Sequence, residues 1–173
     1  MAGERKASYN FRNRAIKLAG PEIKVGDKAP AFTVLAQDFT EVGLDALKGK
    51  PAVLASVPSL DTSVCDMESK RFNDEGAKFG DKVNFVVLSC DLPFGQKRWC
   101  GMANVDKARV YSDHRDRSFG QAYGVYVKET GFLWRAVFVL DKDGVVRYVE
   151  YVPEMGQHPN YDKILETVNK LSA

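Results

Sequence analysis

Two short apolar runs constrain the fold of this chain more than any other feature of its sequence. PAVLASV occupies residues 51–57 and VNFVVLSC occupies residues 83–90. Continuous apolar runs of this length are typical of strands that are buried on both faces, as in parallel sheets covered by helices. The segment between the runs predicts a helix from about Thr62 to Phe79. We therefore expect an α/β protein.

Further strands and helices alternate along the rest of the chain. The pattern predicts strands at 31–36 and 108–112, a helical turn at 44–48, a short helix at about 94–102 and an amphipathic helix at about 161–171. The apolar runs at 132–140 and 145–152 flank DKDG, and an Asp-Gly turn between two such runs indicates a β-hairpin. The order β-α-β-α-β-β-α gives a mixed sheet with helices on its faces. A thioredoxin-like fold fits this order, as do several other three-layer α/β folds.

The chain length and its first residues set the domain organisation. A chain of 173 residues suits one domain with a sizeable core, so residues 1–173 are expected to form a single domain. Within residues 1–24, polar and apolar residues alternate in SYNF and AIKL around Arg12–Arg14. This alternation predicts an N-terminal β-hairpin extension.

Composition excludes several classes of function. The 25 basic and 23 acidic side chains give a net charge of +2, which does not favour nucleic acid or an anionic membrane as a partner. No apolar run reaches the roughly 18 residues of a membrane span. The polar start MAGERKASYNFRNR lacks the apolar core of a secretory signal, so a cytoplasmic location is expected by default.

The cysteines indicate thiol chemistry or inert buried thiols. There are three, Cys65, Cys90 and Cys100, with no CxxC motif, and the chain has only two histidines. An odd count in a cytoplasmic chain argues against a disulfide framework, and a structural zinc site needs four well-spaced ligands. We expect neither a metal nor a cofactor.

Cys65 occupies the most informative position. If Thr62 caps the helix, Cys65 is its third residue, where the helix dipole and free backbone N–H groups favour a nucleophilic thiolate. The helical period places Cys65 on the same face as Phe72 and Phe79, so the sulfur is expected to face the sheet. On these residues alone, an inert buried cysteine stays open as the alternative.

Three stretches of the chain resemble a known family. Pro58-x-x-x-Thr62-x-x-Cys65 resembles the active-site signature of peroxiredoxins. Together, PSLDTSVCD, DLPFGQKRWC and WRAVFVLD are similar to the thiol peroxidase subfamily, the atypical two-cysteine peroxiredoxins, and the match runs from about Val25 to the C-terminus. Ser63 stands where many members carry Pro, which is favoured at a first helical position but not required there.

This resemblance implies both an activity and roles for residues. It implies a thioredoxin-like fold, reduction of hydroperoxides, a homodimer and thioredoxin as the electron donor. Cys65 would be the peroxidatic cysteine, which becomes a sulfenic acid, and Cys100 the resolving cysteine that closes a disulfide with it. Thr62 and Arg135 would stabilise the departing oxygen, and Pro58 would shield the pocket.

The residues themselves support separate interpretations of Arg135, Cys100 and Cys90, without the resemblance. Arg135 interrupts an apolar strand, so it either meets an anion or extends from a strand end to solvent. Lys97 and Arg98 lower the thiol pKa of Cys100 if they approach it. Cys90 ends an apolar strand and reads as a buried, inert thiol.

Two other functions and one conformational step follow from the same residues. A thiol-disulfide oxidoreductase and a redox-responsive chaperone are the competing functions, although the missing CxxC weakens the first. Cys65 and Cys100 belong to helices that follow different strands, so the reduced thiols are not expected at bonding distance. Opening of residues 93–102 is expected to bring them together, because Pro93 and Gly95 limit the first turn of that helix.

Overall fold

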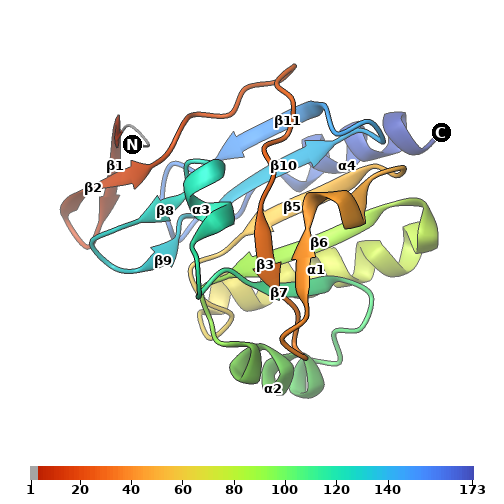
Figure 1. Ribbon diagram of the computed structural model, residues 1–173, viewed down its shortest axis with the longest axis horizontal. Helices are drawn as coiled ribbons and strands as arrows, with labels where there is room; N and C mark the ends of the chain where they lie inside the picture. The colour runs from red at the N-terminus through yellow and green to blue at the C-terminus, as the bar shows by residue number, and fades with distance from the viewer. Residues whose placement is uncertain (1–3) are drawn as a thin grey trace.

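The computed structural model describes residues 4–173, which form two β-sheets with helices packed around the larger one (Figure 1). Within these residues the larger sheet has seven strands, in the spatial order β11 (Val146–Tyr151), β10 (Ala136–Leu140), β5 (Ala52–Ser56), β6 (Asn84–Ser89), β7 (Arg109–Ser112), β3 (Thr33–Leu35) and β4 (Glu41–Gly43). The smaller sheet has the order β1 (Glu4–Phe11), β2 (Arg14–Ala19), β8 (Tyr126–Val127) and β9 (Phe132–Leu133). The helices are α1 (Ser63–Phe79), α2 (Pro93–Ala103), α3 (Ser118–Ala122) and α4 (Tyr161–Ser172), with 3₁₀ turns η1 (Leu44–Leu47) and η2 (Gly80–Lys82).

The parallel centre of the large sheet matches the two apolar runs. Strands β5, β6 and β7 are parallel neighbours, and α1 and α2 make the two crossovers between them. Strand β10 joins β5 antiparallel, with Val139 opposite Val53. This confirms the expected mixed sheet and the hairpin over DKDG, where β10 pairs with β11. None of the helices within residues 4–173 is long and apolar enough to cross a membrane.

The two faces of the large sheet pack against different partners. Val53 and Ala55 of β5 point toward α1 and α4, where they meet Phe72 and Ile164. The alternate residue Leu54 belongs to the cluster on the other face, which includes α3 and the N-terminal hairpin. In Figure 1, α1 and α4 run behind the sheet and α3 lies in front of it. The predicted inward face of α1, which carries Cys65, is confirmed.

The apolar run at 132–140 forms two strands rather than the one that its pattern predicts. β9 pairs with β8 in the small sheet, whereas β10 pairs with β5 in the large sheet. Trp134 and Arg135 lie at the crossing between the sheets, where the Trp134 indole donates to the Val152 carbonyl at 2.8 Å. Apart from Arg135 the run is apolar, because its strands are buried or half-buried, so its pattern predicts one strand and does not mark the break.

The N-terminal hairpin is present over residues 4–19. Arg12 and Asn13 form its turn with φ angles of 48° and 62°, and Phe11 pairs with Arg14. Positive φ at both central residues is the requirement of a type I′ turn, whose twist matches that of the strands. β2 also pairs with β8, so the hairpin belongs to the second sheet. Residues 1–3 of the expected extension lie outside the described part of the chain.

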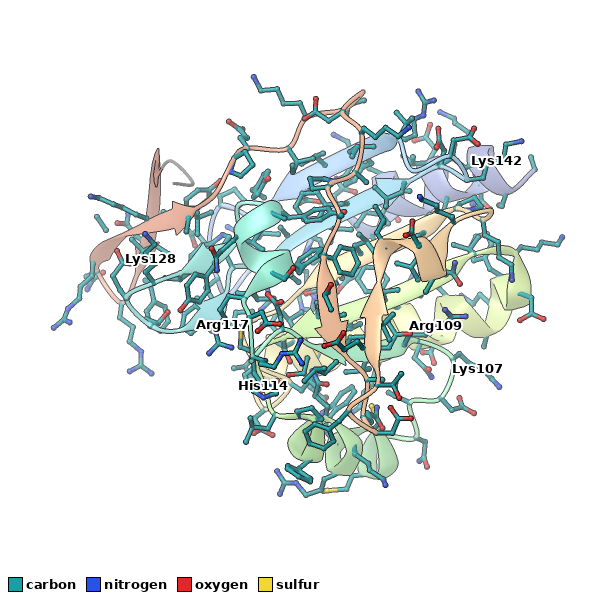
Figure 2. The ribbon with its side chains drawn as sticks, viewed as in Figure 1. Lys107, Arg109, His114, Arg117, Lys128 and Lys142 are labelled. Atoms are coloured by element: carbon teal, nitrogen blue, oxygen red, sulfur yellow. The ribbon has the colours of Figure 1, made fainter. Side chains whose placement is uncertain are left out.

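Hydrogen bonds to Asp113 hold the segment between β7 and α3. The Asp113 carboxylate accepts hydrogen bonds from the backbone N–H groups of Phe119 at 3.0 Å and Gly120 at 2.8 Å. Burial raises the pKa of Asp113 to about 6, although these two N–H groups oppose the rise. Figure 2 shows His114 and Arg117 in this same segment. Helix α3 was not predicted, since five residues are too short for a helical pattern.

A core substitution tests this arrangement. Phe138 of β10 is fully buried and contacts the rings of Phe119, Tyr123 and Tyr151. We expect Phe138→Ala to lower the free energy of unfolding by about 3–5 kcal/mol, the usual cost of such a cavity. Urea unfolding followed by circular dichroism measures it. The matched control Phe94→Ala removes a ring that is 71% exposed and should cost less than about 1 kcal/mol. Equal losses would contradict the assigned core.

Candidate active site

Cys65 lies where the chain leaves β5 and enters α1. Pro58 is buried directly after this strand, and Thr62 is the N-cap residue of the helix, with an extended backbone at φ −90° and ψ 147°. Cys65 is therefore the third helical residue, as predicted, and it is fully buried. The Thr62 hydroxyl does not cap the backbone. Its oxygen lies 2.6 Å from the Cys65 sulfur and 3.1 Å from the Ser59 carbonyl oxygen, so its proton can serve either acceptor.

Arg135 approaches the same sulfur from the break between β9 and β10. Its Nη2 donates to Cys65 Sγ at 3.3 Å, and its side chain is 1% exposed. Nε and Nη2 also donate to the Met155 carbonyl at 3.2 and 3.1 Å, and Nη1 forms an ion pair with Glu68. Every nitrogen of the guanidinium thus has a partner in the interior. Of the two expected placements of Arg135, the structure has the one that meets an anion.

Glu68 completes a buried row of charged groups. It lies one turn after Cys65 on α1 and is fully buried, and its Oε1 has no hydrogen-bond partner among the described residues. Burial raises the pKa of Glu68 to about 7, and the charge of Arg135 only partly opposes the rise. Burial also disfavours the charged form of Arg135, but Glu68 and Cys65 outweigh it, so the net pKa of Arg135 is raised. The guanidinium remains a cation while the carboxyl group titrates near neutrality.

Asp91 fixes the loop that leads to Cys65. Its carboxylate accepts from the Ser59 hydroxyl at 2.8 Å, the Leu60 backbone N–H at 2.9 Å and the Ser89 hydroxyl at 2.7 Å. Ser59 and Leu60 precede Cys65, whereas Ser89 ends β6. The loop after β5 is thereby joined to the end of the neighbouring strand. Both ends lie at one edge of the sheet because the two strands are parallel.

Cys100 lies on α2, in separate surroundings from Cys65. Gln37, in the turn between β3 and β4, donates its side-chain N–H to Cys100 Sγ at 3.2 Å. Figure 1 shows the end of the β3–β4 hairpin beside α2. Burial raises the pKa of Cys100, and the Gln37 hydrogen bond only partly offsets this. The condition under which Lys97 and Arg98 would lower this pKa is not met, because both side chains are exposed while Cys100 faces inward.

The remaining thiol has no catalytic surroundings. Cys90 is half-buried after β6, and burial raises its pKa to about 12 despite the nearby charge of Arg117. All three cysteines are free thiols, and Cys65 and Cys100 have no hydrogen-bond partner in common. Within residues 4–173, no group of three or more His, Cys, Asp or Glu side chains is placed to hold a metal ion.

The predicted site residues thus fall into two groups. Thr62 and Arg135 converge on Cys65, Pro58 lies in the loop before it, and Cys100 lies apart on α2. A buried sulfur with a hydroxyl, a guanidinium and a helix N-terminus around it suits a nucleophile that attacks an electrophilic oxygen. Sequence reasoning missed four groups that support this geometry: Glu68, Asp91, Gln37 and the Met155 carbonyl.

Comparison with known proteins places this site in a family. The Redoxin family matches residues 24–165. A thiol peroxidase of Bacillus subtilis is 51% identical over 95% of this chain and 98% of its own length, and one of Halalkalibacterium halodurans is 51% identical over 92% and 96%. The crystal structure of a peroxiredoxin-like protein from Aquifex aeolicus has a TM-score of 0.87 at 42% identity, over 94% of this chain and 96% of its own. This chain therefore belongs to the Redoxin family and, within it, to the thiol peroxidases.

Proposed function

We propose that this thiol peroxidase uses Cys65 as the attacking thiolate and Cys100 as the resolving thiol, and that thioredoxin restores both. One observation carries the proposal. Thr62 Oγ1 and Arg135 Nη2 lie 2.6 and 3.3 Å from the sulfur of a cysteine that has no exposed surface. Arg135 is buried, and a donor held in a dry site stabilises developing charge without first having to reorganise, whereas Thr62 is exposed and reaches the sulfur from the mouth of the site.

The first step oxidises Cys65. The thiolate attacks one oxygen of the hydroperoxide, the O–O bond breaks, and the sulfur becomes a sulfenic acid. The other oxygen leaves with the bond's electron pair and takes a proton, giving water or an alcohol. Arg135 and Thr62 stabilise the negative charge that develops on this oxygen, and Pro58 limits the access of further peroxide.

Glu68 acts by positioning Arg135. Its carboxylate pairs with Nη1, and the Met155 carbonyl accepts from Nε and Nη2. These contacts fix the plane of the guanidinium and direct Nη2 at the sulfur of Cys65. A fixed donor loses less entropy when the reaction begins than a mobile one.

The second step forms a disulfide. The Cys100 thiol attacks the sulfenic sulfur, releases water and closes a Cys65–Cys100 bond, which two electrons from thioredoxin then reduce. A disulfide requires the two Cα atoms within about 7 Å, and Cys65 and Cys100 are free thiols that bond to different partners, so we infer that α2 moves before the bond closes. We place this cycle in the cytoplasm and in a homodimer, which is the commonest soluble assembly.

Substitution of each cysteine tests this division of labour. Cys65→Ser should abolish peroxide turnover, because a hydroxyl is a far weaker nucleophile near neutral pH. Cys100→Ser should consume about one peroxide per chain and then stall as the sulfenic acid or a more oxidised form. Peroxide consumption with reduced thioredoxin, followed by mass spectrometry, distinguishes the two. Multiple turnovers in the Cys65→Ser protein would rule the proposal out.

The role of Arg135 is separable from its structural effect. Arg135→Met should slow Cys65 oxidation by about 10²-fold, a typical loss for one transition-state donor. It should also lower stability by about 3–5 kcal/mol, because Glu68 is left buried without its counter-ion. Adding Glu68→Gln should restore much of the stability but none of the rate, as measured by urea unfolding and stopped-flow oxidation. If rate recovers together with stability, Arg135 has only a structural role.

Glu68 should make stability depend on pH. Its pKa rises from 4.5 to about 7 on folding, so the folded state holds this proton more tightly than the unfolded chain. The contribution of Glu68 to stability is therefore fully present below pH 4.5 and is lost as the pH rises through 7. At about 1.4 kcal/mol for each unit of pKa difference, the total loss of unfolding free energy is on the order of 3 kcal/mol.

Glu68→Gln removes this titration and should flatten the profile between pH 5 and pH 8. Asp113 titrates in both proteins, with a pKa of about 6. The informative quantity is therefore the difference between the urea-unfolding profiles of the two proteins. Parallel profiles would show that Glu68 keeps the same protonation state on folding.

A further inference from the structure

We propose that a hydrogen bond between Trp99 and Asp66 is a gate that sets how fast Cys100 reaches oxidised Cys65. This inference rests on the function proposed above. Trp99 Nε1 donates to Asp66 Oδ1 at 3.1 Å. Asp66 directly follows Cys65 and Trp99 directly precedes Cys100. One bond therefore joins the residues next to the two sulfurs, and it holds α2 against the first turn of α1.

The first turn of α2 is anchored independently of this bond. Gln96 is fully buried, and its side-chain amide donates to the Ser89 hydroxyl at 3.0 Å and the Tyr111 carbonyl at 2.9 Å. Pro93 begins the helix, a position where its fixed φ favours the helix and its missing N–H costs nothing. The sequence-based expectation that Pro93 weakens this turn was therefore wrong. Residues 93–96 stay attached to β6 and β7.

The second part of α2, residues 97–103, has fewer attachments. Lys97, Arg98, Gly101 and Met102 are exposed, and Trp99 and Cys100 face inward. Gly101 costs a helix interior about 1 kcal/mol relative to alanine. The side-chain hydrogen bonds of this part to other elements are the Trp99 bond and the contact of Cys100 with Gln37.

Two features of the surroundings suit a bond that breaks and re-forms. A cleft of about 250 Å³ lies between the Cys65 loop and α2, and Leu60, Gly95 and Trp99 are among the residues that line it. The indole therefore has open space beside it. Asp66 accepts from Lys70 through its other oxygen, Oδ2, at 2.8 Å, so Oδ1 remains for the indole.

The gate decides between two fates of the sulfenic acid. In one, the Cys100 thiol attacks the Cys65 sulfur, water leaves and a disulfide forms. In the other, a second hydroperoxide transfers an oxygen to the same sulfur, giving sulfinic acid and water or an alcohol. A closed gate lengthens the life of the sulfenic acid and so favours the second fate. Trp99 thus acts as a positioning residue for Cys100.

Trp99→Phe tests the gate because it keeps an aromatic ring and removes the N–H donor. After one equivalent of hydrogen peroxide, rapid quenching and mass spectrometry should show the disulfide closing about three to ten times faster, the range for the loss of one ordinary intramolecular hydrogen bond. The rate of sulfenic acid formation should stay within about twofold. The peroxide concentration at which half of the Cys65 is converted to sulfinic acid should rise by the same factor as the rate of disulfide closure.

Lys70→Ala is the matched control, since it removes the other partner of the same carboxylate and leaves the gate intact. Its closure rate should equal that of the wild type. If Trp99→Phe does not fold, Asp66→Ala removes the acceptor instead and should accelerate closure in the same way. Unchanged closure in the variant that folds would overturn the gate. A wild-type protein whose Cys65 is not oxidised by peroxide would instead overturn the proposed function.

Hydrogen exchange of the reduced protein locates the moving part. Amides of residues 97–103 should exchange faster than the Gln96 amide, which donates to the Leu92 carbonyl at 3.0 Å, and Trp99→Phe should accelerate only the former. Uniform exchange along α2, or acceleration of its first turn, would overturn the division of the helix.

Discussion

The site depends on one buried cation. The Arg135 guanidinium has almost no exposed surface, and such a charge is tolerated only where anions and carbonyl groups surround it. Glu68, the Met155 carbonyl and the Cys65 sulfur supply these partners from α1 and from the segment after β11. The same contacts therefore serve two purposes: they give the buried arginine the partners that its charge needs, and they place a hydrogen-bond donor beside the sulfur. One cation between two acidic groups also ties the charge of Cys65 to that of Glu68.

The topology explains why these groups meet. Strands β5 and β6 are parallel, so the loop before Cys65 and the Asp91 turn leave the same edge of the sheet and can be bonded to each other. Arg135 arrives by another route, at the point where the chain leaves the small sheet and enters the large one. A continuous strand alternates its side chains between two faces. Arg135 extends the alternation of β10, in which Val137 and Val139 face the cluster that contains Cys65 while Trp134 and Ala136 face the other side, so its side chain reaches the helix face that carries Cys65.

Local sequence patterns were sufficient to predict part of the candidate active site and insufficient to predict the rest of it. The sequence predicts the capped start of α1 from Thr62 and Cys65, because the helix dipole and the spacing of these residues depend on a single turn. Arg135 was predicted from the family resemblance. Glu68 lies three residues after Cys65, a spacing that makes helical neighbours, but a glutamate usually indicates an exposed face. Only the arginine from a distant strand makes its burial tolerable. The bonds of Asp91 and Trp99 likewise join segments about 30 residues apart, which no periodicity reveals.

Two demands on the molecule conflict, and the structure separates them in space. Attack on peroxide needs a sulfur held still in a dry pocket, so the loop, the arginine and the first turn of α1 are fixed by buried hydrogen bonds. Closure of the proposed Cys65–Cys100 disulfide needs one thiol to travel, and opening costs least where few buried groups must be exposed. Residues 97–103 come nearest to that condition in α2, because Lys97, Arg98, Gly101 and Met102 already face water and only Trp99 and Cys100 are buried, while Gln96 holds the turn before them. In the cycle that we propose, mobility is thus confined to the part of α2 that carries Cys100, and the pocket around Cys65 keeps its geometry until the sulfenic acid has formed.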